Sequence, residues 1–123
     1  MSRKLDDLNP AFRPKAVELV ARCIEAGIPV MIVDTIRTPE EHAANLVSGT
    51  SKTKHSKHLD GLAIDIAPYE TWQAHGPDKL NWDAGKPGAV KEPWGTMGRI
   101  GEGLGLRWGG RWRDPFDPGH FEL

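Results

Sequence analysis

Histidines and carboxylates gather in two short segments of this 123-residue chain. The first segment carries His58 and Asp65 on either side of a glycine turn at Gly61, and the second carries Asp117 and His120. Two imidazoles and one carboxylate form a common ligand set for zinc, and three protein ligands leave the fourth tetrahedral position for water, as in catalytic zinc sites. If the strands that carry them are neighbours, His58, Asp65 and His120 can bind one catalytic zinc ion.

Hydrolysis of an amide bond at such a centre also needs a base and a positive charge. Asp117 lies three residues before His120, so its carboxylate can reach a water molecule at the metal and take its proton. Arg37 follows a run of β-branched residues, and a guanidinium at that strand end can stabilise a developing oxyanion. The chain has five tryptophans, and we expect most of them to pack in the core, although Trp108, which precedes two glycines close to the second segment, can also form one wall of a substrate pocket.

Two of these residues also have an ordinary interpretation. Asp117 begins an Asp-Pro-Gly sequence, which is typical of turns. Arg37 has Glu40 and Glu41 as candidate partners for a surface ion pair. On spacing alone, both interpretations stay open.

The remaining histidines and the basic patch carry weaker signals. His55 is an alternative ligand to His58, although the glycine turn favours His58. We interpret His42 and His75 as surface residues. Three lysines lie close together in a Ser/Thr/Gly-rich stretch that we interpret as a solvated loop, and they are Lys52, Lys54 and Lys57.

The spacing of apolar residues predicts the elements that must position the site. It predicts an amphipathic helix from Arg13 to Ala26 and, in the β-branched run from Pro29 to Ile36, a buried strand with Arg37 at its end. Strict alternation from Leu62 to Ala67 predicts a second strand, on which Asp65 points away from the apolar face.

The rest of the chain completes the predicted fold. Thr38 is the expected N-cap of a short helix that ends near Val47, and residues 68–93, broken by glycine and proline, are predicted to form a long loop. Residues 94–104 are predicted to form a second helix, and residues 106–108 and 120–123 are predicted to form two short strands. This order predicts an α+β fold, a small single domain over residues 1–123 with a central antiparallel sheet and flanking helices on one side of it.

Composition and charge exclude several classes of protein. Sixteen basic and seventeen acidic residues leave a net charge of -1, which provides no general attraction for nucleic acid. The longest apolar run, Ile28 to Val33, is too short for a membrane span, and the N-terminus lacks the apolar region of a secretory signal. Cys23 is the only cysteine, which excludes an intrachain disulfide and a cysteine zinc site. We expect a soluble monomer without membrane insertion.

The pattern Ser56-x-His58-x-x-Gly61-x-Ala63-x-Asp65, followed by Asp117-x-x-His120, resembles the signature of the zinc D-Ala-D-Ala carboxypeptidase family. This family includes VanY-like carboxypeptidases, vancomycin-resistance D,D-dipeptidases and phage L-alanyl-D-glutamate endopeptidases. The segment from Ile36 to Glu41 is similar to the family's Arg-Thr segment, and residues 104–123 resemble the phage endolysin branch.

The resemblance implies a role for each matching residue. It implies that His58, Asp65 and His120 bind zinc. It also implies that Asp117 is the catalytic base, that Arg37 stabilises the transition state and that Ser56 orients substrate. The implied fold is the small α+β domain that these peptidases share with the hedgehog signalling domain. Arg111 departs from the pattern, because many endolysin relatives carry an acidic residue after the two glycines, and the change affects the expected substrate fit near Trp112.

The implied function is hydrolysis of the L-alanyl-D-glutamate bond in peptidoglycan stem peptides by a phage or prophage endolysin. Such a protein is made in the bacterial cytoplasm without a signal peptide and reaches the wall through a holin pore, and we expect no separate wall-binding domain. Two alternatives stay open, a D,D-carboxypeptidase or dipeptidase that releases D-Ala and a hedgehog-like zinc domain that binds without hydrolysis. Residues 68–93 and Arg111 are expected to shape the pocket that separates the two peptidases.

Overall fold

The computed structural model describes residues 2–38, 40–41, 43–44, 56–70 and 79–123. Short 3-10 helices are labelled η. The elements follow one another in the order η1 (Leu5–Asp7), α1 (Arg13–Glu25), β1 (Val30–Asp34), η2 (Lys57–Asp60), β2 (Ala63–Glu70), β3 (Lys79–Leu80), β4 (Gly85–Lys86), β5 (Ala89–Val90), α3 (Trp94–Gly103), β6 (Arg107–Trp108), η3 (Gly109–Arg111) and β7 (His120–Glu122).

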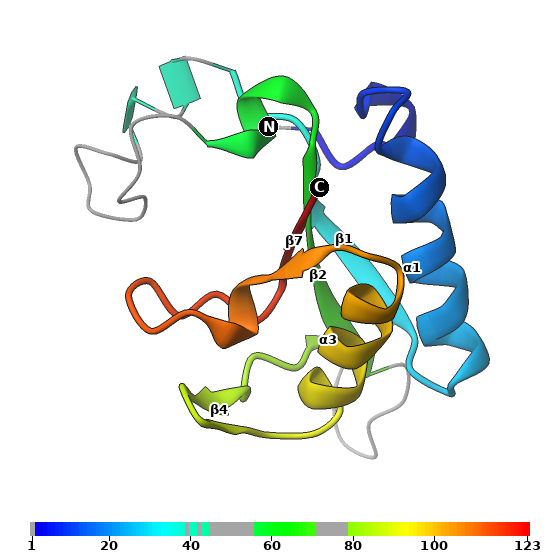
Figure 1. The fold of residues 1–123 in the computed structure, drawn as a ribbon, viewed down its shortest axis with the longest axis vertical. Helices are drawn as coiled ribbons and strands as arrows, with labels where there is room; N and C mark the ends of the chain where they lie inside the picture. Colours follow the sequence, from blue (N-terminus) through cyan, green and yellow to red (C-terminus); the bar gives the residue numbers. More distant parts are fainter. Residues whose placement is uncertain (1, 39, 42, 45–55, 71–78) are drawn as a thin grey trace.

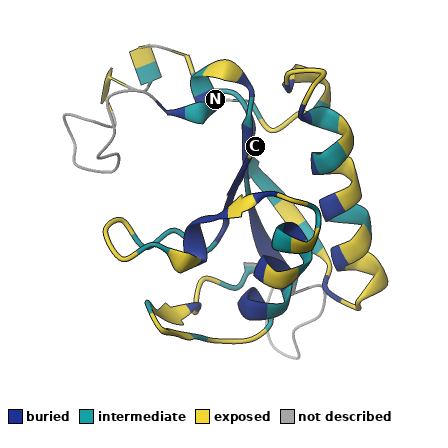
Figure 2. Ribbon diagram, viewed as in Figure 1, coloured by how far each residue is buried: buried dark blue, intermediate teal, exposed yellow. Residues whose placement is uncertain are grey.

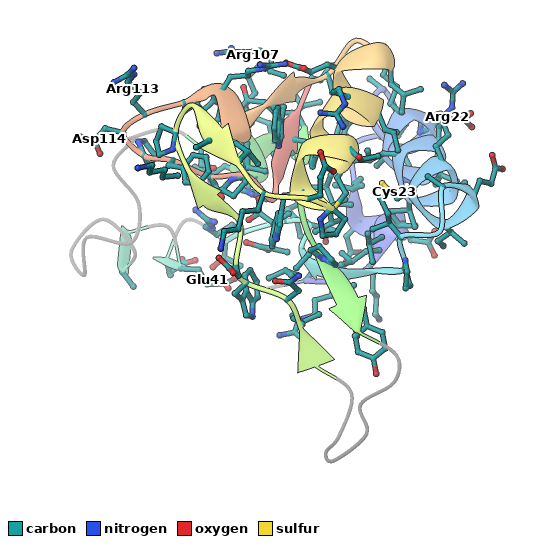
Figure 3. All side chains as sticks on the ribbon, turned by 90° about the horizontal axis from the view of Figure 1, so that it is seen from below. Arg22, Cys23, Glu41, Arg107, Arg113 and Asp114 are labelled. Carbon is teal, nitrogen blue, oxygen red and sulfur yellow. The ribbon has the colours of Figure 1, made fainter. Side chains whose placement is uncertain are left out.

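The strands form an antiparallel sheet in the order β1-β2-β7-β6 (Figure 1). β3 pairs with the far end of β2, where Tyr69 faces Leu80, and these two strands project from the body of the domain (Figure 3). The predicted α+β fold with a central antiparallel sheet is confirmed. The predicted β-branched strand is β1, the alternating strand is β2 and the terminal strand is β7.

α1 and α3 cover one face of this sheet. The buried side chains of α1 are Ala16, Leu19 and Cys23, which recur at the helical interval and form its inner stripe. A Cβ atom at Gly101 of α3 would lie 2.4 Å from the ring of Phe121 in β7, so glycine at this position lets the helix approach the sheet. Figure 2 shows the buried residues along the sheet and the inner sides of both helices, whereas the outer side of α1 is exposed.

The register of β2 against β7 decides which side chains share the opposite face. Ile64 pairs with Phe121, and Asp65 pairs with His120. Because side chains alternate along a strand, Ile64 and Phe121 turn toward the helices, while Asp65 and His120 turn away from them. On the other side of β2, an irregularity in β1 brings Asp34 opposite Asp65. Two carboxylates and one imidazole therefore meet across three strands.

Residues 68–93 do not form the simple loop that the sequence predicts. β2 continues to Glu70 and pairs with β3, and β4 and β5 form a hairpin. Pro87 and Gly88 make its two-residue turn, with Gly88 at a φ of 81°. Strands of two residues are too short to display an alternating pattern, so the prediction was wrong for this part of the segment. Residues 71–78 lie outside the described part of the chain.

The helix expected after Thr38 begins as predicted. The hydroxyl oxygen of Thr38 accepts a hydrogen bond from the Glu41 amide at 3.1 Å, and Glu41 Oε1 accepts one from the Thr38 amide at 3.2 Å, which is a reciprocal N-terminal cap. Residues 40, 41, 43 and 44 are helical, and the rest of the predicted helix lies outside the described residues. Within the described ranges, no helix has both the length and the apolar composition needed to cross a membrane.

Candidate metal centre and active site

The structure brings together the three side chains predicted as ligands. His58 comes from η2, Asp65 from β2 and His120 from β7, and one nitrogen or oxygen of each lies within 4.8 Å of the others. Both imidazoles are buried, and the Asp65 side chain is mostly so. Three donors from separate parts of the chain thus converge on one point at the face of the sheet that the helices leave open.

His58 is positioned by the short turn that carries it. Ser56 caps η2, with its hydroxyl accepting a hydrogen bond from the His58 amide at 3.2 Å. Gly61 ends the turn at a φ of 70°, a conformation that side chains disfavour, and Asn9 leaves no room there for a Cβ atom. The His58 Nδ1 atom donates to the carbonyl oxygen of Thr35 at 2.8 Å. This bond directs Nε2 toward Asp65.

His120 is held from both ends of its ring. Its Nε2 donates to Glu122 Oε1 at 2.8 Å, and its Nδ1 lies 2.9 Å from Asp65 Oδ1. Burial alone lowers the pKa of His120, but the hydrogen bonds to Asp65 and Glu122 outweigh it and raise the pKa to about 10. Burial raises the pKa of Asp65, yet the hydrogen bond from His120 and the proximity of His58 hold this pKa well below its usual range. The site therefore strongly favours positive charge between its carboxylates.

The donor set fits a divalent cation. His58 Nε2 lies 3.1 Å from Asp65 Oδ2, is buried, and has no hydrogen-bond partner among the described residues. In the neutral imidazole with its proton on Nδ1, Nε2 directs a lone pair toward the Asp65 carboxylate, and a cation bound between these two electron-pair donors would satisfy both. Two nitrogens and one oxygen, each imidazole oriented through its other ring nitrogen, match the ligands and the supporting hydrogen bonds of zinc sites.

Asp117 lies beside this cluster without belonging to it. Its Oδ2 is 3.8 Å from His120 Nδ1, and its side chain is half exposed. Partial burial and the charge of Asp65 raise the pKa of Asp117 to about 6, against the opposing effect of the two imidazoles and Arg37. The Asp117 amide donates to the carbonyl oxygen of Gly109 at 3.1 Å, and a Cβ atom at position 109 would lie 2.2 Å from the Asp117 carbonyl oxygen. Glycine at position 109 thus permits the backbone approach that places this carboxylate.

Arg37 is held at the end of β1 by a partner that the sequence analysis missed. Its Nη2 donates to Asp34 Oδ2 at 3.2 Å, and both side chains are mostly buried. The Arg37 amide also donates to the carbonyl oxygen of His58 at 3.2 Å. Burial raises the pKa of Asp34, although the charges of His58 and Arg37 oppose the shift. The guanidinium is therefore anchored close enough for its charge to act on Asp117.

A cleft of about 320 Å³ opens beside the cluster. Asp65 and Asp117 belong to its lining, and three aromatic side chains contribute to its wall. Its lining residues are Val33, Asp65, Ile66, Trp82, Ala84, Gly85, Trp94, Phe116, Asp117, Pro118 and Gly119. Much of this wall belongs to residues 79–94, within or directly after the segment predicted as a pocket-forming loop.

Trp108 and Ser56 are both predicted to contact substrate, and neither is among the residues that line the cleft. Trp108 is 4% exposed and donates its indole N–H to the carbonyl oxygen of Pro118 at 2.8 Å. The structure puts it in the core, where it supports the strand that carries His120, and the aromatic wall comes from other residues. Ser56 is buried as the cap of η2. Contact of Ser56 with substrate stays a prediction.

Arg111 forms contacts within the fold. Its Nε and Nη2 donate to the two carboxylate oxygens of Glu102 in α3 at 3.0 and 2.9 Å, and its guanidinium lies 5.3 Å from the centre of the Trp108 ring. This residue, which departs from the expected acidic type, therefore ties η3 to α3.

Sequence reasoning also missed Glu122. The signal was present, because residues two apart on a strand share a face, so that His120 and Glu122 must point the same way. Other candidates fall outside the described residues, and these are His42, His55, His75, Lys52, Lys54 and Trp72.

Comparison with known proteins agrees with this arrangement. The sequence signature described as D-alanyl-D-alanine carboxypeptidase matches residues 49–123, which is more than half of the chain and includes both histidine-containing segments. The chain belongs to this family. The match begins after Arg37, so the strand that carries the arginine lies outside it.

Three curated relatives extend the comparison. The L-alanyl-D-glutamate peptidase of Listeria phage A118 is 39% identical over 79% of this chain, and the match spans 31% of that protein. The L-alanyl-D-glutamate peptidase of Escherichia phage T5 is 33% identical over 90% of this chain and 88% of that protein. The peptidoglycan L-alanyl-D-glutamate endopeptidase CwlK of Bacillus subtilis is 29% identical over 95% of this chain and 74% of that protein.

One solved structure has the same fold. The L-Ala D-Glu endopeptidase ChiX of Serratia marcescens superposes with a TM-score of 0.68, covering 97% of this chain and 82% of that protein. The sequences are 21% identical, so this likeness concerns the fold.

Proposed function

We propose that this protein is a zinc peptidase that hydrolyses the L-alanyl-D-glutamate bond of peptidoglycan stem peptides. One observation carries the proposal above all: the buried Nε2 atom of His58, which has no hydrogen-bond partner among the described residues, lies near Asp65 and His120, with the Asp117 carboxylate beside them in the lining of a cleft. The three curated relatives are named for cleavage of this bond, and their names support the choice of substrate.

Each residue of the site has a role in this proposal. His58 Nε2, Asp65 and His120 Nδ1 would hold one zinc ion, which would supply Lewis acidity toward the scissile carbonyl group and the attacking water. Asp117 takes a proton from that water and delivers it to the nitrogen of the departing D-glutamate as the amide C–N bond breaks. A base with a pKa of about 6 is ionised at neutral pH and still accepts a proton readily. Arg37 stabilises the negative charge that develops on the carbonyl oxygen.

We further infer that the protein acts as a phage or prophage endolysin. Two of the relatives come from phages, which supports a role in opening the bacterial wall. In this role the protein is made in the bacterial cytoplasm and reaches peptidoglycan through a holin pore. Expression in a bacterial host with and without a holin tests this: lysis that needs both proteins supports it, and lysis without the pore contradicts it.

A second candidate is a D,D-carboxypeptidase that releases terminal D-Ala. The description of the matching family favours it. The two activities use the same metal ligands and base, and they differ in the bond that the cleft presents to them.

Mass spectrometry of the products released from purified peptidoglycan separates the candidates. The experiment uses zinc-loaded protein, chelator-treated protein, and treated protein to which zinc has been restored. Fragments with a new D-glutamate amino group, lost on chelation and recovered with zinc, are the expected result. Release of D-Ala alone would assign the protein to the carboxypeptidases. Absence of any zinc-dependent product from several wall types would contradict both and favour a binding domain without hydrolysis.

A further inference from the structure

We propose that Trp82 and the aromatic wall behind it bind the sugar-linked half of the stem peptide, and that Trp82 is a specificity-determining residue. This half consists of the L-alanine, the lactyl group and the muramic acid ring that precede the scissile bond. The inference rests on the proposed function and assigns a direction to the substrate in the cleft.

The first argument is the position of Trp82. Trp82 is 63% exposed, more than any other large apolar side chain of the described residues, and it lines the cleft. Its ring lies 6.2 Å from that of Trp94, which is buried. Trp94 in turn lies against Gly119, where an added Cβ atom would be 3.4 Å from the indole. Gly119 directly precedes His120, so a buried ring, Trp94, links the backbone beside the metal centre to the exposed ring of Trp82.

The second argument is that the backbone around this exposed ring is well connected. The Ala84 amide donates to the Trp82 carbonyl oxygen at 3.1 Å, and the Lys91 amide donates to the Ala84 carbonyl oxygen at 2.9 Å. The Asn81 side chain accepts a hydrogen bond from the Asp83 amide at 2.9 Å. An aromatic side chain on a constrained backbone loses little conformational freedom when a ligand covers it, which favours binding.

The third argument is charge. Among the described residues that line the cleft, only Asp65 and Asp117 are charged, and both are acidic. The peptide beyond the scissile bond begins with D-glutamate, which carries a carboxylate, whereas the lactyl-L-alanyl half and its N-acetylated sugar are uncharged. Asp65 and Asp117 both belong to the catalytic site, so the rest of the described wall offers no cation to pair with a carboxylate, and a carboxylate buried there without a partner would lose its hydration. The neutral half therefore fits the aromatic wall, and the glutamyl half extends away from it.

The apolar face of a sugar ring and an indole are complementary surfaces. Trp94 lies against Gly119, next to His120, whereas Trp82 is exposed to solvent. Trp82 is therefore assigned to the sugar, and the methyl groups of L-alanine and lactate are assigned to the part of the cleft nearer the metal. This order along the cleft follows the order of groups along the substrate.

The test compares two substrates that differ only before the scissile bond. One is N-acetylmuramoyl-L-alanyl-D-glutamyl peptide, and the other carries an N-acetyl group on the alanine in place of the lactyl sugar, so that neither has a charged N-terminus. We expect Trp82→Ala to raise KM for the muramoyl substrate on the order of tenfold with little change in kcat, because the lost contact binds ground state and transition state alike. The KM values of the two substrates should then approach each other, and Trp82→Phe should recover part of the difference.

A matched control and a binding measurement complete the design. Ile24→Ala removes an exposed apolar side chain on α1, outside the cleft, and should leave both KM values as they are. In NMR spectra of the indole N–H groups, the Trp82 signal, assigned by its loss in Trp82→Phe, should shift on addition of N-acetylmuramoyl-L-alanine and stay in place on addition of the glutamyl fragment.

The outcomes separate this inference from the proposed function. If the wild-type protein cleaves neither substrate, the proposed function fails, and the NMR titration still reports whether the cleft binds the sugar-linked half. If both substrates are cleaved and Trp82→Ala leaves the ratio of their KM values unchanged, the assignment of Trp82 is wrong. A Trp82 signal that responds to the glutamyl fragment alone would reverse the direction assigned to the substrate.

Discussion

Replacement of Glu122 tests how the metal centre is held. Glu122 Oε1 accepts a hydrogen bond from His120 Nε2 at 2.8 Å, and both side chains are more than nine-tenths buried. Glu122→Ala removes the acceptor that fixes the orientation of the imidazole and the nitrogen that carries its proton. Glu122→Gln keeps an oxygen that can accept the same bond but removes the negative charge. The two variants therefore separate orientation from charge.

The expected loss can be worked out in two ways. Removal of a group that orients a metal ligand typically weakens metal binding by about 10–100-fold. Independently, a hydrogen bond that involves a charged group contributes about 1.5–3 kcal/mol, which corresponds to roughly 10–150-fold in affinity. Because the estimates agree, we expect Glu122→Ala to bind zinc about 10–100-fold more weakly, and Glu122→Gln, which keeps the acceptor, to lose no more than about tenfold.

The assay is competition for zinc against a chromophoric chelator at constant pH, with circular dichroism to verify the fold. Arg107→Ala is the matched control, because Arg107 Nη1 lies 3.5 Å from the other oxygen of the same carboxylate but is 66% exposed, at the surface of the domain (Figure 3). It should change zinc affinity by less than about twofold, since exposed ion pairs contribute little. A folded Glu122→Ala protein with wild-type zinc affinity would refute the reasoning. If Glu122→Ala does not fold, the other two variants decide. The reasoning would be refuted by an unchanged zinc affinity in Glu122→Gln together with a changed zinc affinity in Arg107→Ala.

Further predictions concern the base, the core and the buried thiol. Asp117→Asn should lower kcat by about 10²–10⁴-fold, while atomic absorption finds the zinc content unchanged, because Asp117 is not among the three ligands. Gly98→Ala would place a Cβ atom 2.3 Å from the Trp108 ring and should destabilise the fold in urea by about 1–3 kcal/mol; at Gly103 of the same helix no atom lies within 4 Å, so Gly103→Ala should stabilise it by up to about 1 kcal/mol. Burial raises the pKa of Cys23 from 9.0 to about 11, so the folded protein holds this proton more tightly than the unfolded chain. The protonated thiol therefore contributes its full stabilisation below pH 9, and the free energy of unfolding falls by roughly 2–3 kcal/mol as the pH rises to about 11. Urea unfolding of Cys23→Ala should not show this decrease.

Local patterns were sufficient for the larger elements. The helix expected over residues 13–26 is α1, Arg13–Glu25, and the helix expected over residues 94–104 is α3, Trp94–Gly103, despite its four glycines. In α3 the glycines are required by packing, since Gly98 and Gly101 lie against the rings of Trp108 and Phe121. Helix propensity by itself argued against this helix, and close contact with the sheet explains why it forms.

The short elements escaped prediction for a different reason. β3, β4 and β5 have two residues each, and they exist because neighbouring strands or a turn complete their hydrogen bonds. The exposure of Trp82 and the burial of Trp108 were also beyond prediction. Trp82 and Trp108 each follow a short stretch that resembles a strand or a turn, so the local sequence does not separate them. Only the packing of α3 and of the β4–β5 hairpin leaves Trp82 in the cleft wall and Trp108 in the core.

By itself the sequence determined the chemical groups of the site and the local backbone that carries them: two imidazoles and a carboxylate, a second carboxylate three residues before His120, and turns that only glycine permits. The tertiary structure decided which atoms of these groups meet. The pairing of Asp65 with His120 joins residues 55 positions apart, while Asp34 and Thr35 at the end of β1 and Glu122 in β7 contact the site from either side of β2. A shift of one residue in the register of β7 would turn His120 and Glu122 to the other face of the sheet, because strand side chains alternate. Register is a property of the packed core, so it is visible only once the chain has folded.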